Sequence, residues 1–160
     1  MTTSDPENTE IYAPTVEVRA LLGVFALYWR MDEAFCRQEV MHGLGRMECY
    51  LMMQLDAPRR MGELARLMTL VPSAVTSAAD RLERDGLAQR VRDTEDRRAF
   101  RLQLTPKGRD LRRELENKAG DAFREISGLS AADIQKFATL SGKIQNTILG
   151  PGNSRPDKEI

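Results

Sequence analysis

The stretch from Asp80 to Gly108 constrains the fold of this chain more than any other segment. It reads DRLERDGLAQRVRDTEDRRAFRLQLTPKG, in which a helical pattern ends and two short alternating runs follow. Gly86 marks the helix end, because glycine adopts the left-handed C-terminal cap without steric cost. Residues 87–92 and 100–104 have the period of a β-strand. The stretch therefore predicts a helix followed by a β-hairpin, with a charged turn at residues 93–98.

Two short helices are expected just before this hairpin. Residues 61–68 place their apolar side chains on one side of a short helix. Pro72 suits the first position of the next helix, because its backbone angle is pre-set and its missing N–H would be unpaired there. Two helices that meet at a tight turn form a helix-turn-helix, whose second helix lies in the major groove of DNA. Together with the hairpin they predict a winged helix-turn-helix.

Longer helices are expected on both sides of this unit, so the predicted fold class is mainly α. Residues 16–38, 45–55, 106–126 and 131–148 carry apolar side chains at helical spacing. These stripes exceed what a small winged helix can cover. Operator-binding helix-turn-helix proteins pair two modules across a two-fold axis. We therefore expect the long terminal helices to form a homodimer interface.

The 160 residues fit one DNA-binding domain with dimerisation arms. Residues 1–13 and 150–160 are polar and unpatterned, so we expect disordered tails. Residues 14–58 are expected to form the N-terminal dimerisation helices and residues 59–104 the winged helix-turn-helix DNA-binding domain. Residues 105–149 are expected to form the C-terminal dimerisation helices.

Positive charge is concentrated on the expected winged helix, although the whole chain is neutral. Residues 1–58 hold four Lys/Arg and nine Asp/Glu, residues 59–113 hold fourteen and eight, and residues 114–160 hold six and seven. A local basic face supplies the phosphate neutralisation that DNA binding needs. The alternative is a solvated surface with scattered arginines. The coincidence with the hairpin favours the first interpretation.

Nothing in the sequence indicates a membrane partner. The most apolar early stretch, residues 20–29, is too short to cross a bilayer. The amino terminus lacks the basic start of a secretory signal. We therefore expect a cytoplasmic location.

Short motifs from the first short helix to the helix after the hairpin form one pattern: Leu64-Ala65, Ser73-x-x-Thr76, Asp80-Arg81-Leu82-Glu83, Asp85-Gly86-Leu87, Asp93-x-x-Asp96-Arg97-Arg98 and Leu104-Thr105-x-x-Gly108. With them the chain resembles, over about residues 16–149, the MarR family of bacterial winged helix-turn-helix transcription regulators. The resemblance implies a triangular dimer of helical arms that carries two winged helices. We expect a ligand-responsive repressor that binds double-stranded DNA at a pseudo-palindromic operator.

The resemblance also implies roles for the hairpin. In the family an Asp of the turn braces the Arg two residues on, and that Arg enters the minor groove. These positions match Asp96 and Arg98. A guanidinium held by a neighbouring carboxylate loses less side-chain entropy on binding and suits a narrow, electronegative groove. Arg92 and Arg97 are expected on phosphates.

The second helix of the motif departs from the family pattern at one position. Members often carry Arg directly after the Thr, whereas this chain has Ser77, so bidentate guanine readout is not available there. Base recognition then depends on Arg81, on apolar contact of Ala74 with thymine methyl groups, or on DNA shape. A salt bridge within the helix or to the adjacent strand is an equal alternative for Arg81. The candidate DNA-binding residues are Ser73, Ala74, Thr76, Ser77, Arg81, Arg92, Arg97 and Arg98.

Two alternatives to a ligand-responsive regulator remain open. The weakly basic second helix is compatible with a winged helix that binds protein. Cys36 and Cys49 are candidate redox residues, so a thiol-based sensor acting through Cys36 is the other. Buried structural thiols are the commoner explanation, and no metal-ligand spacing occurs around His42. Catalysis is not expected, because His42 is the only histidine and no nucleophile motif accompanies it.

Aromatic and methionine side chains of the N-terminal helices are candidates for an effector pocket between the arms and the winged helix. Side chains of this kind at helical spacing are more often simple core. The family resemblance favours a small lipophilic or phenolic effector, and no cofactor is expected. The candidate pocket residues are Tyr28, Trp29, Phe35, Met47 and Tyr50.

Overall fold

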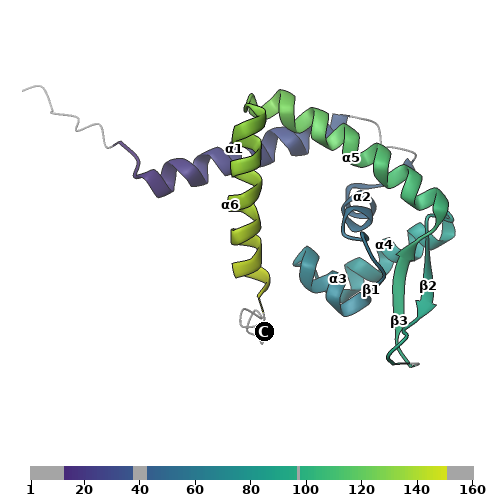
Figure 1. The fold of residues 1–160 in the computed structure, drawn as a ribbon. Coiled ribbons are helices and arrows are strands. Elements are labelled where there is room, and N and C mark those ends of the chain that lie inside the picture. The colour runs from purple at the N-terminus through teal and green to yellow at the C-terminus, as the bar shows by residue number, and fades with distance from the viewer. Residues whose placement is uncertain (1–12, 38–42, 97, 151–160) are drawn as a thin grey trace, which may run out of the picture.

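The structure is a computed structural model that describes residues 13–37, 43–96 and 98–150, without the side chains of residues 35–37. The expected tails, His42 and Arg97 thus lie wholly or mostly outside the described residues. The described chain is mainly helical with a small sheet, which confirms the predicted fold class (Figure 1). The elements are α1 (Val16–Arg37), α2 (Arg46–Met53), β1 (Arg59–Arg60), α3 (Met61–Met68), α4 (Pro72–Arg84), β2 (Ala88–Arg92), β3 (Phe100–Leu104), α5 (Pro106–Ser127) and α6 (Ala131–Leu149).

The sheet is antiparallel, with the strand order β1-β3-β2. In β2 and β3 Ala88 pairs with Leu104, which sets the register of the expected hairpin. The third strand, β1, was not expected from the sequence. Its two residues are too few to show any period in the sequence. The strand is defined by its pairing with β3, in which Arg60 lies opposite Arg101.

The ends of α3, α4 and α5 follow local backbone rules. Pro72 occupies the first turn of α4, and Gly86 lies just beyond its end with a positive φ of 70°. Thr69 closes α3 in the left-handed region, with a φ of 55°, and makes the tight turn of the helix-turn-helix. Thr105 caps α5, because its hydroxyl oxygen accepts the N–H of Gly108 at 3.1 Å.

One hydrophobic core joins α2, α3, α4, the sheet and the first turns of α5. The helix α2 therefore packs inside the winged helix, and the boundary expected at residue 58 runs through a single packed unit. The fully buried large side chains are Leu44, Leu51, Met52, Leu64, Val75, Leu82 and Leu102.

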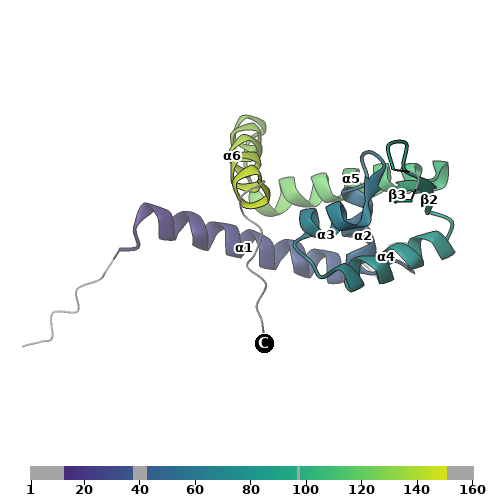
Figure 2. The same ribbon diagram turned by 90° about the horizontal axis from the view of Figure 1, so that it is seen from below.

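The helices α1 and α6 lie outside this core as arms (Figures 1 and 2). Figure 2 shows α1 reaching well beyond the winged helix, and α6 contains no buried residue. Both arms expose large apolar side chains in the single chain. These are Val16, Val18, Leu21, Leu22, Val24, Phe25, Tyr28 and Trp29 on α1, and Leu140, Ile144 and Ile148 on α6.

No helix in the described ranges is long and apolar enough to span a membrane.

Candidate nucleic-acid interface

The helix α4 presents small polar side chains at its exposed start. Its apolar residues, among them Val75 and Ala79, are buried, whereas Ser73, Thr76 and Ser77 are exposed. The Thr76 hydroxyl donates to the carbonyl oxygen of Pro72 at 3.0 Å, and the Ser77 hydroxyl donates to that of Ser73 at 3.1 Å. Each hydroxyl oxygen still has acceptor capacity. This surface matches the face expected to meet DNA, with Ala74 half-buried at its edge.

Arg81 lies one turn after Ser77 on α4, and its guanidinium is bonded to neighbouring groups. Its Nη2 donates to the carbonyl oxygen of Gly43 at 2.7 Å, and its Nε lies 3.5 Å from the Asp85 carboxylate. The structure thus contains the within-helix salt bridge that the sequence left open as an alternative. A base contact by Arg81 would require these bonds to be exchanged, and it stays a prediction.

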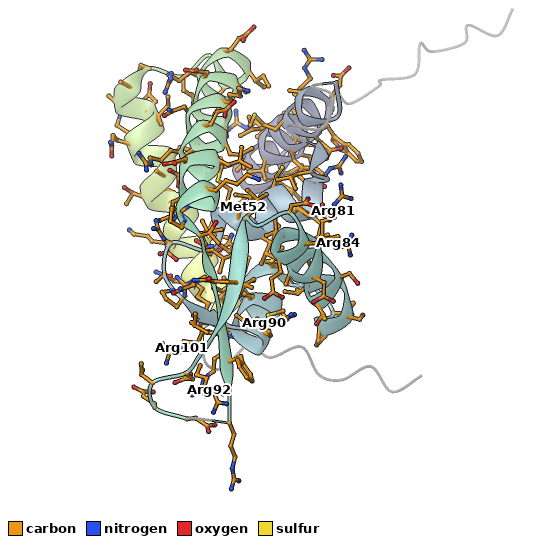
Figure 3. The ribbon with its side chains drawn as sticks, turned by 90° about the vertical axis from the view of Figure 1, so that its right-hand side faces the viewer. Met52, Arg81, Arg84, Arg90, Arg92 and Arg101 are labelled. Carbon is orange, nitrogen blue, oxygen red and sulfur yellow. The ribbon has the colours of Figure 1, made fainter. Side chains whose placement is uncertain are left out.

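Arg90 fastens the hairpin to α4. Its guanidinium pairs with Asp80 at 2.8 Å and also with Glu83, and its backbone N–H donates to Glu83 at 2.9 Å. Figure 3 shows Arg81 and Arg84 on α4 and Arg90 and Arg92 on the hairpin, and Arg92 is exposed. The position of the hairpin relative to α4 is therefore set by side chains as well as by the core.

The turn of the hairpin is organised by Asp93, which sequence reasoning did not single out. Asp93 is only 2 % exposed. One carboxylate oxygen, Oδ2, accepts from Arg60 Nε at 2.6 Å and from Arg101 Nε at 2.7 Å. The other, Oδ1, accepts the backbone N–H groups of Glu95 at 2.8 Å and Asp96 at 3.3 Å. Hydrogen bonds from Arg101, then Arg60, then the turn backbone hold the pKa of Asp93 far below its ordinary value.

Asp96 contacts Arg98 through the backbone. Its Oδ1 accepts the N–H of Arg98 at 3.0 Å, which fixes the turn locally and leaves the Arg98 side chain exposed. The proposed brace of the guanidinium by Asp96, and its entry into the minor groove, stay predictions.

The described candidate effector residues lie at the surface or against the core, and an effector pocket formed by them stays a prediction. Tyr28 and Trp29 are 56 % and 64 % exposed, and their rings meet edge to face with centroids 5.6 Å apart. Tyr50 is also exposed, and Met47 packs against the core. The side chain of Phe35 lies outside the described residues.

A cavity of about 430 Å³ lies elsewhere, between the end of α2, β1, α3, α5 and the last turn of α6. Its lining is rich in arginine. The Nε of Arg112 is buried and is without a hydrogen-bond partner in the described chain. The polar lining residues include Gln54, Asp56, Arg59, Arg66, Arg112, Gln145 and Asn146.

Of the two candidate redox cysteines, only Cys49 has a described side chain. It is half-buried on α2 against the core. Burial, followed by the charge of Glu48, raises the pKa of the Cys49 thiol. A raised pKa lowers the fraction of reactive thiolate, so the surroundings of Cys49 do not favour oxidant sensing.

A helix-turn-helix followed by an antiparallel hairpin, with long helical arms attached, defines the class of winged helix-turn-helix proteins. The MarR family model matches residues 57–100, which run from just before β1 to the first residue of β3. Over this segment the chain is similar to the MarR family.

Individual relatives show a similarity of the same kind. The chain is 36 % identical over 87 residues to the HTH-type transcriptional repressor MdtR of Bacillus subtilis, which is 53 % of this chain and 56 % of MdtR. It thus spans about half the length of the curated relatives that it matches. The crystal structure of the transcriptional regulator BldR from Sulfolobus solfataricus has 27 % identity and a TM-score of 0.68, covering 82 % of this chain and 96 % of BldR. Wild-type MarR from E. coli shares the fold, with 17 % identity, a TM-score of 0.61 and coverage of 83 % and 98 %.

Proposed function

We propose that this chain is a DNA-binding transcription regulator. The observation that carries the proposal is the exposed start of α4 beside an arginine-bearing hairpin, within the segment that matches the MarR family model. Small hydroxyl side chains on α4 would face base edges and phosphates in the major groove, while Arg98 would reach the flanking minor groove. Because bidentate readout by an Arg after Thr76 is absent, phosphate contacts and DNA shape carry more of the binding.

The regulator acts as a homodimer in this proposal. The apolar side chains of α1 and α6 are exposed in one chain, and a second copy would bury them. Two winged helices related by a two-fold axis would read a pseudo-palindromic operator whose half-sites lie about 34 Å apart. MdtR is named a repressor, which supports repression as the mode of action.

A ligand response is the further part of this proposal. The arginine-lined cavity lies between α3 of the winged helix and the end of the α6 arm. A ligand held there would alter how the winged helix sits on the arm, and therefore the spacing of the two reading helices. A winged helix that binds protein, and a sensor acting through Cys36, have no comparable support in the described residues.

The Arg98→Ala variant tests DNA binding through the hairpin turn. We expect operator affinity to fall by about 1–3 kcal/mol, because a cation in the minor groove is lost, with little change in Tm. Operator fragments selected from genomic DNA and titrated by fluorescence anisotropy supply the measurement.

Arg124→Ala is the matched control, because Arg124 is an exposed arginine in the last turn of α5. Its affinity should equal that of the wild type. Equal affinities for all three proteins would overturn the role of the hairpin, and failure to select any fragment would overturn DNA binding.

A further inference from the structure

A buried carboxylate holds two arginines where the strands of the hairpin meet its turn. Asp93 follows the last residue of β2, and Arg60 and Arg101 face each other across β1 and β3. Both guanidiniums direct their Nε atoms to the same oxygen, Oδ2 of Asp93. Arg101 adds a second bond, from Nη2 to Oδ1 at 3.2 Å. The three side chains form one unit, called here the Arg60–Asp93–Arg101 cluster.

The cluster has one cation more than the buried carboxylate requires. The Asp93 side chain is completely buried, whereas those of Arg60 and Arg101 are 46 % and 30 % exposed. Arg60 donates only its Nε to Asp93, and its half-exposed guanidinium makes no other hydrogen bond to a described side chain. Glu95 lies 3.8 Å from Arg101 Nη2, but it is 82 % exposed and such surface pairs are weak and screened. Asp96 is the other nearby carboxylate.

A purely structural role does not account for the second arginine. One arginine neutralises a buried carboxylate, and burying further charge costs desolvation energy. Arg101 alone makes two bonds to Asp93 and would satisfy its charge. The half-exposed Arg60 therefore adds a fixed positive charge at the surface.

We propose that Arg60 and Arg101 bind the DNA phosphate backbone beside the groove entered by the hairpin turn, and that Asp93 positions both guanidiniums for this contact. The proposal rests on the proposed DNA-binding function. It adds three residues that lie outside the exposed start of α4 and outside the tip of the turn.

The spacing along the hairpin fits this contact. Arg101 is three residues from Arg98, or about 10 Å in an extended strand. The minor groove is about 6 Å wide and is bordered by phosphates on both sides. A turn inserted into the groove therefore brings the adjoining ends of β2 and β3 over a bordering DNA strand. Figure 3 shows Arg92 and Arg101 at the end of the hairpin next to the turn.

Asp93 orders the side chains of both arginines before an anion binds. An arginine fork matches phosphate oxygens, and its binding is stronger when the side chain is already ordered. Because Asp93 is itself held by two backbone N–H groups of the turn, the two guanidiniums keep a fixed position relative to Arg98. The hairpin then presents a groove contact and a backbone contact as one rigid unit.

The test measures how DNA binding depends on salt, which reports phosphate contacts without knowledge of the operator. The full-length chain is titrated into a fluorescent random-sequence duplex of about 30 base pairs at salt concentrations from roughly 50 to 200 mM. We expect Arg60→Gln and Arg101→Gln each to weaken binding several-fold and to lower the salt slope by about one per protomer. Arg60→Lys should keep the wild-type slope, because it keeps the charge.

Controls separate this proposal from the general one. Arg124→Gln should bind like the wild type. If the wild type shows no salt-dependent binding, the proposed function fails. If the wild type binds but both Gln variants keep its slope, the phosphate contact fails while the function stands.

Asp93→Asn tests the positioning role. The variant loses one negative charge, so simple electrostatics predicts tighter binding. Loss of positioning predicts weaker binding, and that is the result we expect. Tighter binding would overturn the role of Asp93. If this variant does not fold, the contrast between Arg60→Gln and Arg60→Lys decides whether an oriented guanidinium is needed or a charge suffices: a Lys variant that binds as tightly as the wild type overturns positioning.

Discussion

At Gly108 the first turn of α5 touches the backbone of the hairpin. A Cβ atom built there would lie 1.9 Å from the carbonyl oxygen of Leu87. That carbonyl cannot move away easily, because it also accepts the N–H of Thr105 at 3.0 Å. The absence of a side chain at Gly108 is therefore what allows the helix, the end of β3 and the start of β2 to meet.

We expect Gly108→Ala to lower the free energy of unfolding by about 3 kcal/mol, because overpacking forces backbone shifts. Urea denaturation followed by circular dichroism measures the change. Gly62→Ala in α3 is the matched control, since a Cβ there meets nothing within 4 Å. It should be neutral or slightly stabilising, because alanine is the better helix former. A Gly108→Ala protein as stable as this control would contradict the close contact.

Single residues also show where sequence reasoning stops. The turn holds two aspartates, Asp93 and Asp96, and the motif drew attention to Asp96. The structure shows Asp93 to be the buried one. It is bound by Arg60, which lies 33 residues earlier in the chain, and by Arg101, which lies eight residues later. Local periodicity carries no information on such distant pairs. It does identify the surface of α4, where Ser73 and Thr76 are exposed as expected.

Elements were predicted well wherever they have a period. The helices α3 and α4 and the strand β3 match their expected ranges closely, because each has one buried face. The two-residue β1 has no period and was missed. The packing of α2 with the winged helix was missed for another reason: its apolar side chains indicate burial but not the neighbour against which they pack.

The proposed ligand response is located at the junction of α3 with α6, where a bound ligand would change how the two helices pack. Arg66 of α3 donates from Nη1 to the carbonyl oxygen of Leu149, the last residue of α6, at 2.6 Å. The arginine-lined cavity lies at this junction, and the buried Nε of Arg112 has no partner within the described part of the chain. A carboxylate would supply the missing acceptor, while Leu67 and Leu149 offer apolar walls.

We therefore expect benzoate to stabilise the protein, by about 1.4 kcal/mol at roughly tenfold excess over its Kd. Neutral phenol should stabilise it less, because phenol brings no charge to pair with the arginines. Differential scanning fluorimetry of the wild type and of Arg112→Met measures the ligand-induced shift in Tm. Arg124→Met serves as the matched control and should respond like the wild type. Equal shifts in all three proteins would place the binding site elsewhere.

At the scale of the whole molecule, the helical arms α1 and α6 leave apolar side chains exposed in a single chain. The exposed apolar side chains of α1, from Val16 to Trp29, cover successive turns of a helix that projects from the core (Figure 2). Exposed apolar surface of this extent marks an interaction site. A second copy of the same chain would cover it symmetrically, and this would also place two copies of α4 at a fixed distance. A dimer formed through α1 would therefore also set the spacing of the operator half-sites that the two copies of α4 can bind.

The Phe25→Glu variant tests this link. Phe25 is half exposed on α1, so the substitution should leave the winged helix folded while placing a charge in the proposed interface. Light scattering after size exclusion should give twice the chain mass of 18.1 kDa for the wild type and a single chain mass for the variant. Affinity for a two-half-site operator should fall at least tenfold, because two linked modules gain from effective concentration.

Thr94→Glu is the control. Thr94 is an exposed position in the hairpin turn, far from α1, and the variant should keep the wild-type mass. A wild type that runs as a single chain, or a Phe25→Glu protein that keeps the double mass, would remove α1 from the interface and with it the explanation of its exposed stripe.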